Sequence, residues 1–530
     1  MLDLTLFLPE LVLLVGGIVV LVIDALLRDR GKGEARLGWL ALAFLAVALV
    51  VAVLQWGTNF ALFRQTPALT SPGMYAVDGF TSFFRITAIV TTGLIILMSM
   101  DFIRHRTAFR GEFFALMLFS ALAMILMAGS TDMVMVILSL EFLSITSYIL
   151  TGYLRGNARS NEGAVKYFLF GSVTTAITFY GASLLFGLTG TTNLYEMARG
   201  LSNPTTLQSG DGLGLILPAI VFLIAGFGFK IALVPFHQWS PDAYEGAPVP
   251  VTAFLSVGPK AAGLAMLLRM MVIGMPGFIP SWAALVLGIA IVTMTLGNLV
   301  ALSQSNVKRL MAYSSIAQAG YMAIGVAAIS FVDIARAGGP ADAALASAGT
   351  LAQTAGLGSS IDGTAGVLIY ILAYLFTNLG LFTGIIAVDH LTGAEHIGGY
   401  AGLIKRAPFL TVAMTIFFLS LVGIPPTAGF IGKFWVFGAA LNQGLLLLAV
   451  VGAINGVISV VYYFKMLKEM WLAPPHDATP IRLPGTMMAS LVVCLIMVLV
   501  IGLYPAPFID FANQSIQMFG VGPGLPQAMR

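Results

Sequence analysis

Five ionisable residues lie in stretches of sequence that are otherwise strongly apolar: Glu141, Lys166, Lys230, Lys260 and Lys433. Placing a charged side chain at the centre of a bilayer costs roughly 2.5–3.5 kcal/mol on insertion scales, so such residues usually face a cavity or a partner. A buried lysine has its pKa lowered by desolvation and raised by a nearby carboxylate. Moving or re-pairing that carboxylate can switch the lysine between its charged and neutral forms, which is the chemistry of proton transfer.

Helix geometry sets the expected depth of these residues. At about 1.5 Å per residue, Glu141 and Lys260 each lie roughly 15 Å into their apolar segments, near the middle of a hydrocarbon core about 30 Å thick. We expect Glu141 to lie opposite Lys230 as a tunable pair, with Lys260 and Lys433 continuing the line. Lys166 is shallower. All four basic residues in this set are lysines. Arginine would be a poor choice at these positions, because its pKa is too high to release a proton.

Each of these residues also has a structural interpretation. A single buried Lys–Glu pair can serve as static glue, but five such sites make this a weak account of the set. His237, just after Pro235, is either a relay or a structural residue at a helix end. The tyrosines are expected to be packing residues, namely Tyr148, Tyr167, Tyr313 and Tyr321. Asp132 and Glu162 are expected to cap helices, because helix N-termini favour anions.

Composition places the chain in lipid. Of its 530 residues, 58% are hydrophobic and 9% charged, whereas a soluble domain carries about 25% charged residues. The single cysteine, Cys494, excludes an intrachain disulfide. Iron–sulfur clusters usually need four thiolates, and the five histidines lack metal-ligand spacing. We therefore expect no redox cofactor and no metal in this chain.

A spanning helix needs about 20 apolar residues, and fourteen segments qualify. They are 7–27, 37–55, 79–100, 112–129, 131–151, 162–188, 211–235, 250–273, 281–301, 309–328, 365–388, 408–440, 445–468 and 486–505. With the N-terminus outside, 16 of the 26 Lys and Arg residues fall in inside loops and 6 in outside loops or span ends. This bias follows the positive-inside rule and predicts both termini on the outer, periplasmic side.

Two of the fourteen segments should be broken helices. The seventh reads FGFKIALVPFHQWSPDAYEGAPVP and the twelfth reads FFLSLVGIPPTAGFIGKFWVFG. Proline disrupts a helix, and non-helical backbone at membrane depth survives only beside protein or water. Paired interruptions suggest an internal inverted repeat. We expect an all-α polytopic membrane protein with a three-helix segment at 1–110, five-helix repeats at 111–275 and 276–470, and a last helix with its tail at 471–530. The stretch 329–364 is expected to be a flexible outside loop.

Three segments resemble the antiporter-like subunits of respiratory complex I. They are SLEFLSITSYILTGYLRG, FKIALVPFHQWSPDAYEGAPVPVTAFLSVGPKAAG and NLVALSQSNVKRLMAYSSIAQAGYMAIG. The opening LPELVLLVGGIVVLVIDALL, the lysine in GIPPTAGFIGKFWVF and the KYF context of Lys166 are most similar to subunit N, called subunit 2 in organelle-encoded versions. The chain ends too soon after its last span for the lateral helix of subunit L. The 329–364 loop is longer than the family pattern.

The resemblance implies a proton-translocating module of NADH-quinone oxidoreductase, or of its ferredoxin- or plastoquinone-linked relatives, and we expect it in a bacterial inner membrane. By motif position, Glu141 and Lys230 would form the input pair, Lys260 the central site and Lys433 the output. NADH, FMN, iron–sulfur clusters and quinone would belong to partner subunits, and the neighbours would be other membrane subunits of the complex. Two alternatives stay open: a subunit of a multisubunit sodium/proton antiporter, and a structural scaffold in which neither Lys230 nor Lys260 is needed for pumping.

Overall fold

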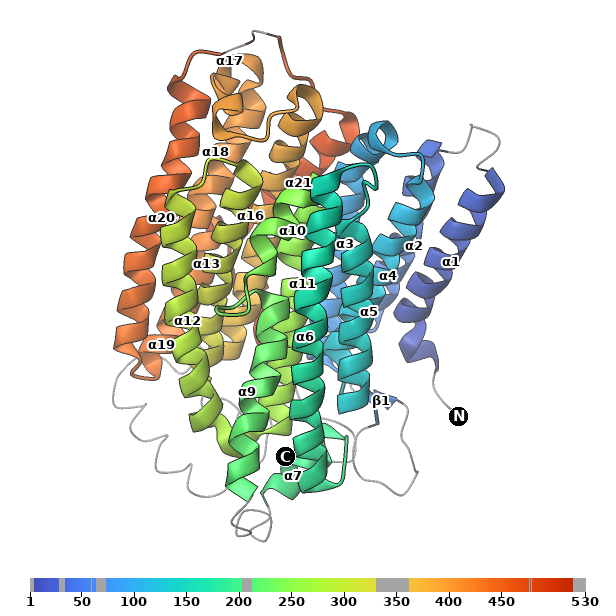
Figure 1. Ribbon diagram of the computed structural model, residues 1–530, viewed down its shortest axis with the longest axis vertical. Helices are drawn as coiled ribbons and strands as arrows, with labels where there is room; N and C mark the ends of the chain where they lie inside the picture. The colour runs from blue at the N-terminus through green and yellow to red at the C-terminus, as the bar shows by residue number, and fades with distance from the viewer. Residues whose placement is uncertain are drawn as a thin grey trace.

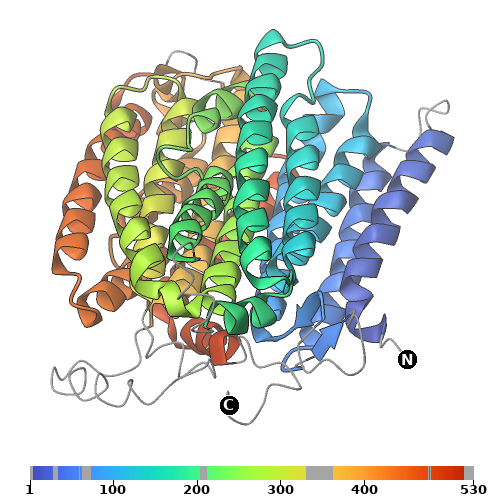
Figure 2. The same ribbon diagram turned by 60° about the horizontal axis from the view of Figure 1, so that its bottom comes forward.

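The computed structural model describes residues 4–27, 34–58, 60–62, 73–202, 212–329, 362–475, 477 and 479–517. These residues form a bundle of long helices that run between its two ends (Figure 1). The N-terminal helices lie at one side of the bundle and α20 at the other, as the turned view also shows (Figure 2). We call the end that holds α17 (Leu403–Arg406) the basic end, because Arg104, Arg106 and Lys405 lie there.

The long helices follow the apolar segments of the sequence. They are α1 (Leu8–Leu27), α2 (Glu34–Leu54), α3 (Gly79–Arg106), α4 (Arg110–Gly129), α5 (Met133–Thr151), α6 (Ala158–Thr189), α9 (Gly212–Ile231), α11 (Val249–Arg269), α12 (Ile279–Leu302), α13 (Val307–Ala327), α16 (Gly363–Thr392), α18 (Pro408–Val422), α19 (Ala428–Asn442), α20 (Leu446–Leu472) and α21 (Gly485–Leu503). Each predicted span lies on one of these helices, and the broken twelfth span lies on α18 and α19. The polytopic all-α prediction is therefore confirmed.

Shorter elements complete the described part of the chain. They are the 3₁₀ turns Leu4–Phe7, Pro276–Phe278 and Ile397–Tyr400, the π-helical turn Met270–Gly274, α7 (Leu194–Leu201), α10 (Trp239–Gly246), α17, α22 (Ala506–Gln517), and the antiparallel strands β1 (Phe60–Leu62) and β2 (Tyr75–Val77). The prediction did not include the strands or α22. Most of the predicted 329–364 loop lies outside the described residues.

Twelve of the described helices are long and apolar enough to cross a membrane, counting α1, α11 and α12 with the turns beside them. The 21-residue α13 is not among them. It carries polar side chains along its length, including Ser314, Ser315 and Gln318, and these are buried. A helix surrounded by protein can carry such groups where a lipid-facing helix cannot, because they find partners inside the bundle. With α13 and the α18–α19 pair, the predicted fourteen spans are accounted for.

Two helices form the centre of the bundle. In an apolar 18-residue stretch of α11 and of α16, 100% of the residues are buried, whereas in those of the peripheral α1 and α2 only 33% are buried. Helix α11 packs against helices from both halves of the chain, including α4, α9, α13 and α16, and α16 packs against α3, α11, α13, α19 and α21. A side chain in the middle of either helix is therefore placed deep within protein, far from lipid.

The two predicted helix breaks are present. The first separates α9 from α10 and the second separates α18 from α19. In each, the residue after the first half-helix is left-handed: Ala232 has φ +65° and Gly423 has φ +93°. The next N–H bonds back to a carbonyl five residues earlier, at 2.8 Å from Leu233 to Gly228 and 3.0 Å from Ile424 to Leu419. Both half-helices thus end in the same type of C-terminal cap.

The two predicted acidic caps have different outcomes. The Asp132 carboxylate accepts a hydrogen bond from the N–H of Val134 and caps α5 as expected. The prediction for Glu162 is wrong, because Asn157 caps α6. Glu162 lies in the second turn of that helix and forms an ion pair with Lys166, at 2.7 Å. The repeat boundaries proposed from the sequence stay a prediction.

Candidate functional site

Lys260 lies at the middle of the central helix α11 and is 1% exposed. Its ammonium group donates hydrogen bonds to the Oγ and the carbonyl oxygen of Ser315 on α13, at 2.6 and 2.8 Å. Tyr374 of α16 donates to the same Ser315 Oγ at 2.9 Å, and the Tyr244 hydroxyl lies 3.4 Å from it. No carboxylate among the described residues pairs with Lys260. The ammonium is therefore held by neutral dipoles, in a position where its charge is not compensated.

Lys230 lies one residue before the end of α9, beside the first break, and its side chain is fully buried. It donates to Ser144 Oγ of α5 at 3.1 Å and to the Tyr167 hydroxyl of α6 at 3.4 Å. Tyr167 stacks on Trp239 of α10, with ring centroids 4.0 Å apart. The Trp239 indole N–H in turn donates to the carbonyl of Phe229, at 2.9 Å. The break is thus closed by aromatic side chains that also border the lysine.

Glu141 lies on α5, one turn before Ser144, and is partly exposed. Its carboxylate accepts a hydrogen bond from Thr175 of α6 at 2.6 Å. No direct ion pair joins Glu141 to Lys230, because the ammonium group is bonded to Ser144 and Tyr167 instead. The two predicted partners therefore share one neighbourhood without touching in this conformation.

Helix α11 links the surroundings of Lys260 with those of Lys230. Gly263 lies one turn after Lys260, and a Cβ there would meet the Lys230 Cβ at 3.4 Å and the Ile231 side chain at 2.9 Å. The absence of a side chain at Gly263 lets α9 approach α11 closely at the level of Lys230. Both lysines consequently belong to one packed layer of helices.

Lys433 lies on α19, after the second break, and is 6% exposed. It donates to the backbone carbonyls of Leu421 and Val422 at 3.0 and 2.7 Å, which are the carbonyls left without partners where α18 ends. Its ammonium group also lies 4.5 Å from the centroid of the Tyr321 ring. Cations are favoured at helix C-termini and over aromatic faces, so Lys433 stabilises the interrupted helix.

A groove of about 530 Å³ extends from Lys433 toward the surface between α19 and α20. Aromatic and aliphatic side chains line it, among them Phe434 and Val457, which are 51% and 71% exposed. The second lysine-bearing break therefore lies at the edge of the bundle, whereas Lys260 lies at its centre.

Polar side chains fill most of the interval between Lys260 and Lys433. Gln318, one turn after Ser315 on α13, donates to the Leu421 carbonyl at 3.1 Å, the same carbonyl that accepts from Lys433. The Tyr370 hydroxyl, one turn before Tyr374 on α16, donates to Gln318 Oε1. One helical turn on α13 and on α16 thus separates the hydrogen-bonded groups around Lys260 from those around Lys433. A water molecule with two or more polar partners can bridge such a gap.

Lys166 lies apart from Lys230, Lys260 and Lys433, which we call the lysine line. It is 40% exposed and forms ion pairs with Glu162 at 2.7 Å and Asp242 at 2.8 Å. Asp242 also pairs with Arg309 of α13, which pairs with Glu245. This cluster ties α6 and α10 of the first half to α13 of the second, near the basic end.

His237 lies in the first break and is partly buried, with Nδ1 shielded and without a hydrogen-bond partner among the described residues. The structure brings it neither onto Lys230 nor onto Lys260 by a hydrogen bond. Whether His237 is a relay or a structural residue stays open.

Some of the site could not be identified from the sequence. Tyr167 and Tyr321 were expected to be packing residues, yet each lies against a buried lysine. Ser315, Gln318, Tyr370 and Tyr374 were not singled out. Their signal is a helical spacing of polar residues, i and i+3 on α13 and i and i+4 on α16.

Two further ion pairs are buried away from the lysine line. Arg85 of α3 bonds to Glu10 of α1 at 2.7 Å, and both side chains are fully buried. Arg269, at the end of α11, bonds to both carboxylate oxygens of Asp78 at 2.9 Å each. The first pair joins α1 to α3, and the second joins the start of α3 to α11, both at the end opposite the basic end.

The helix bundle, its two interrupted helices and its line of buried lysines define the class of antiporter-like membrane proteins. The family described as "NADH:quinone oxidoreductase/Mrp antiporter, TM" matches residues 130–337 and 345–459. NADH-quinone oxidoreductase subunit N 2 of Symbiobacterium thermophilum is 40% identical, covering 96% of each chain. Subunit N of Trichlorobacter lovleyi is 36% identical, covering 97% of each chain.

A chain of respiratory complex I from Thermus thermophilus has the same fold. It is 29% identical, with a TM-score of 0.73, over 95% of this chain and 98% of that one. The chain described here belongs to the NADH-quinone oxidoreductase subunit N family, within the wider group of antiporter-like membrane subunits.

Proposed function

We propose that this chain is a proton-translocating membrane subunit of NADH-quinone oxidoreductase, and that protons pass through Glu141, Lys230, Lys260 and Lys433. The observation that carries the proposal is the setting of Lys260, which is buried at the centre of the bundle and bonded to Ser315 with no carboxylate partner among the described residues. A permanent charge there would be costly. A group that gains and loses a proton during turnover fits that position.

The order of the groups follows their place in the bundle. Glu141 and Lys230 share one neighbourhood at the first break, Lys260 lies on the central helix, and Lys433 lies beside the groove at the second break. The line crosses from the first half of the chain to the second, because Lys260 of α11 is bonded to α13. Lys166 and His237 remain candidate relays at its margins.

Electron transfer belongs to partner subunits in this proposal. NADH, FMN, iron–sulfur clusters and quinone would be bound there, and quinone reduction would drive this chain through conformational and electrostatic coupling. The single cysteine, Cys494, is buried on α21 and cannot supply the thiolates of a cluster alone. The chain would lie in the plasma membrane of a bacterium, with the basic end on the inner side, both termini outside, and other membrane subunits of the complex as neighbours.

The experiment that tests the proposal is Lys260→Ala in the assembled complex, with proton uptake into vesicles and quinone reduction measured together. We expect fewer protons moved per quinone reduced, or loss of both activities where they are tightly coupled. Lys468→Ala on the exposed face of α20 is the matched control. Full quinone reduction with unchanged proton uptake in Lys260→Ala would end the proposal.

The matching family also includes Mrp antiporters, so a subunit of a multisubunit sodium/proton antiporter is the second candidate. The two differ in their genomic and biochemical setting. Neighbouring genes for quinone-site and iron–sulfur subunits favour the first, and sodium-dependent proton exchange without quinone favours the second.

A further inference from the structure

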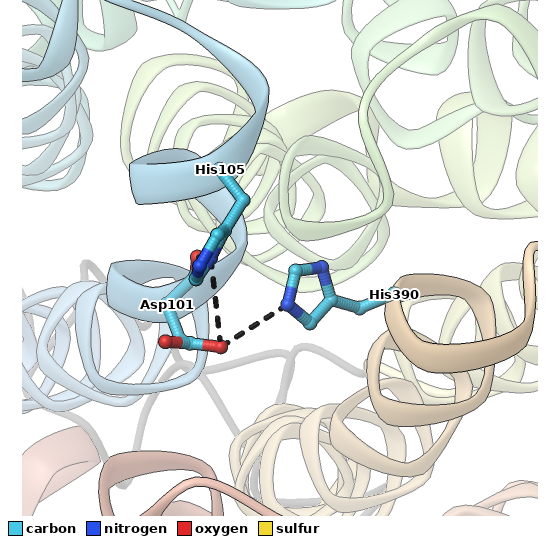
Figure 3. Close-up of side chains that lie close together, drawn as sticks. All are labelled: Asp101, His105 and His390. Carbon is cyan, nitrogen blue, oxygen red and sulfur yellow. Dashed lines mark hydrogen bonds and ion pairs between the residues drawn. The ribbon is translucent and has the colours of Figure 1, made fainter.

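Away from the lysine line, three side chains meet at the basic end: Asp101 and His105 near the end of α3, and His390 near the end of α16 (Figure 3). The Asp101 carboxylate lies between the two imidazoles. Its Oδ2 is 3.1 Å from His390 Nε2 and 3.9 Å from His105 Nδ1. One ligand atom from each residue lies within 4.8 Å of the other two.

We propose that Asp101, His105 and His390 bind a divalent transition-metal ion of the zinc type. Two imidazoles and one carboxylate are a ligand set that Zn²⁺ uses, with bonds of about 2.0–2.2 Å in tetrahedral geometry. Atoms so placed around one ion are roughly 3.3–3.5 Å apart. The observed separations bracket this value, so small side-chain rotations would bring the three donors to it.

The placement of the residues suits such a site. Asp101 and His105 are four residues apart on α3 and therefore lie on the same helix face, and His390 approaches them from α16. His390 is 10% exposed, Asp101 26% and His105 57%. His105 Nδ1 bonds to the backbone carbonyl oxygen of Asp101 at 2.8 Å, so the exposed imidazole would exchange this bond for the ion. Ion and water can thus reach the cluster from the aqueous side, and a fourth coordination position stays open for water.

Basic side chains also lie near the cluster, and Arg104 and Arg110 line the same pocket as Asp101. Arg106 pairs with the carboxylate of Asp389 on α16, at 3.9 Å. Arg110 is turned toward the backbone carbonyls of Thr107 and Arg104, at 3.1 and 2.8 Å. Among the described residues Asp101 forms no ion pair with an arginine, and the two histidines approach it instead.

A bound ion would join α3 to α16. Helix α16 carries Tyr370 and Tyr374, whose hydroxyls bond to groups between Lys260 and Lys433. The ion would therefore tie the N-terminal three-helix segment to the helix that lines the site. This inference concerns binding and does not depend on the proton pathway being correct.

The test is a titration of the purified, metal-stripped complex with Zn²⁺ in competition with a chromophoric chelator. We expect His390→Gln to lose one tightly bound zinc equivalent, and His105→Gln to weaken that equivalent about tenfold or more. His105→Cys should retain it, because a thiolate is a strong zinc ligand. His396→Gln, an exposed histidine at the same end of the bundle, is the control.

Because His105 is exposed, its variants should assemble normally and keep the test decisive even where His390→Gln fails to assemble. Zinc stoichiometry and affinity that are unchanged in His105→Gln and in any assembled His390→Gln complex would overturn the proposal. Loss of zinc in His105→Cys equal to that in His105→Gln would also contradict direct ligation.

Discussion

Lys260 and Ser315 are joined twice, because the lysine ammonium group donates both to the serine Oγ, at 2.6 Å, and to the serine carbonyl, at 2.8 Å. A single residue of α13 thus supplies both hydrogen bonds that hold the central lysine. Ser315 Oγ is also where Tyr374 of α16 bonds. Three helices therefore meet at one hydroxyl group.

Ser315→Ala should slow proton translocation without preventing assembly. The variant keeps the carbonyl bond to Lys260 but removes the hydroxyl that links it to Tyr374. A hydrogen bond to a charged group contributes about 1.5–3 kcal/mol, so we expect proton uptake to fall about tenfold or more at normal complex content. Ser303→Ala, at the exposed end of α12, should have no effect. Wild-type rates in Ser315→Ala would show that this junction is not on the proton path.

The burial of the lysines could be predicted from the sequence, but their partners could not. A charge in an apolar stretch is conspicuous, so Lys230, Lys260 and Lys433 stand out, and the structure buries them. Ser315 and Tyr374 do not stand out, because serine and tyrosine are common within membrane helices. Their role depends on which faces of α13 and α16 meet α11, and this is set by packing between segments far apart in the chain.

The expected Glu141–Lys230 pair shows the same limit. Depth along a helix follows from residue spacing, and both residues are in the expected helices. Rotation of α5 against α9 does not follow from spacing, and it directs Ser144 rather than Glu141 toward the ammonium group. The helix breaks, in contrast, were predictable because proline and glycine act locally.

Lys433 has two roles that different substitutions should separate. Lys433→Met removes the donor to the carbonyls of Leu421 and Val422. Leu421 keeps its bond from Gln318, but the Val422 carbonyl loses its donor, and leaving a buried acceptor unsatisfied costs about 1–3 kcal/mol. We expect less assembled complex and a lower unfolding temperature. Lys433→Arg keeps the donors and the charge but releases a proton poorly, so it should assemble and pump slowly. Equal pumping by Lys433→Arg and the wild type, at equal complex content, would leave Lys433 only its structural role.

Gly423 should be intolerant of a side chain for two reasons. Its φ of +93° is unfavourable for other residues, at roughly 1–2 kcal/mol, and an added Cβ would meet Lys433 Cδ at 2.8 Å. Gly444 has a φ of +71° with nothing within 4 Å of an added Cβ. Gly444→Ala should therefore show the backbone cost alone.

Comparing Gly423→Ala with Gly444→Ala isolates the contact with Lys433. We expect the larger loss of thermal stability and the loss of proton pumping in Gly423→Ala. Equal effects of the two variants on unfolding temperature and on pumping would mean that Lys433 shifts freely.

The Asp78–Arg269 pair should be among the strongest stabilising contacts between α3 and α11. Both side chains are at most 5% exposed, and the pair has two hydrogen bonds of 2.9 Å. Arg269→Ala leaves Asp78 as an uncompensated buried charge, which costs about 3–5 kcal/mol. The exposed pair of Arg155 and Glu112, at 3.9 Å, is the control, because such pairs contribute under about 1 kcal/mol.

We therefore expect the unfolding temperature of the purified complex, followed through release of this chain, to fall by many degrees for Arg269→Ala and hardly at all for Arg155→Ala. Asp78→Asn combined with Arg269→Ala should recover part of the loss, because the buried carboxylate charge is then gone. A double variant as unstable as Arg269→Ala alone would show that the loss comes from missing packing of the long arginine side chain. The lost stability would then come from packing rather than from charge.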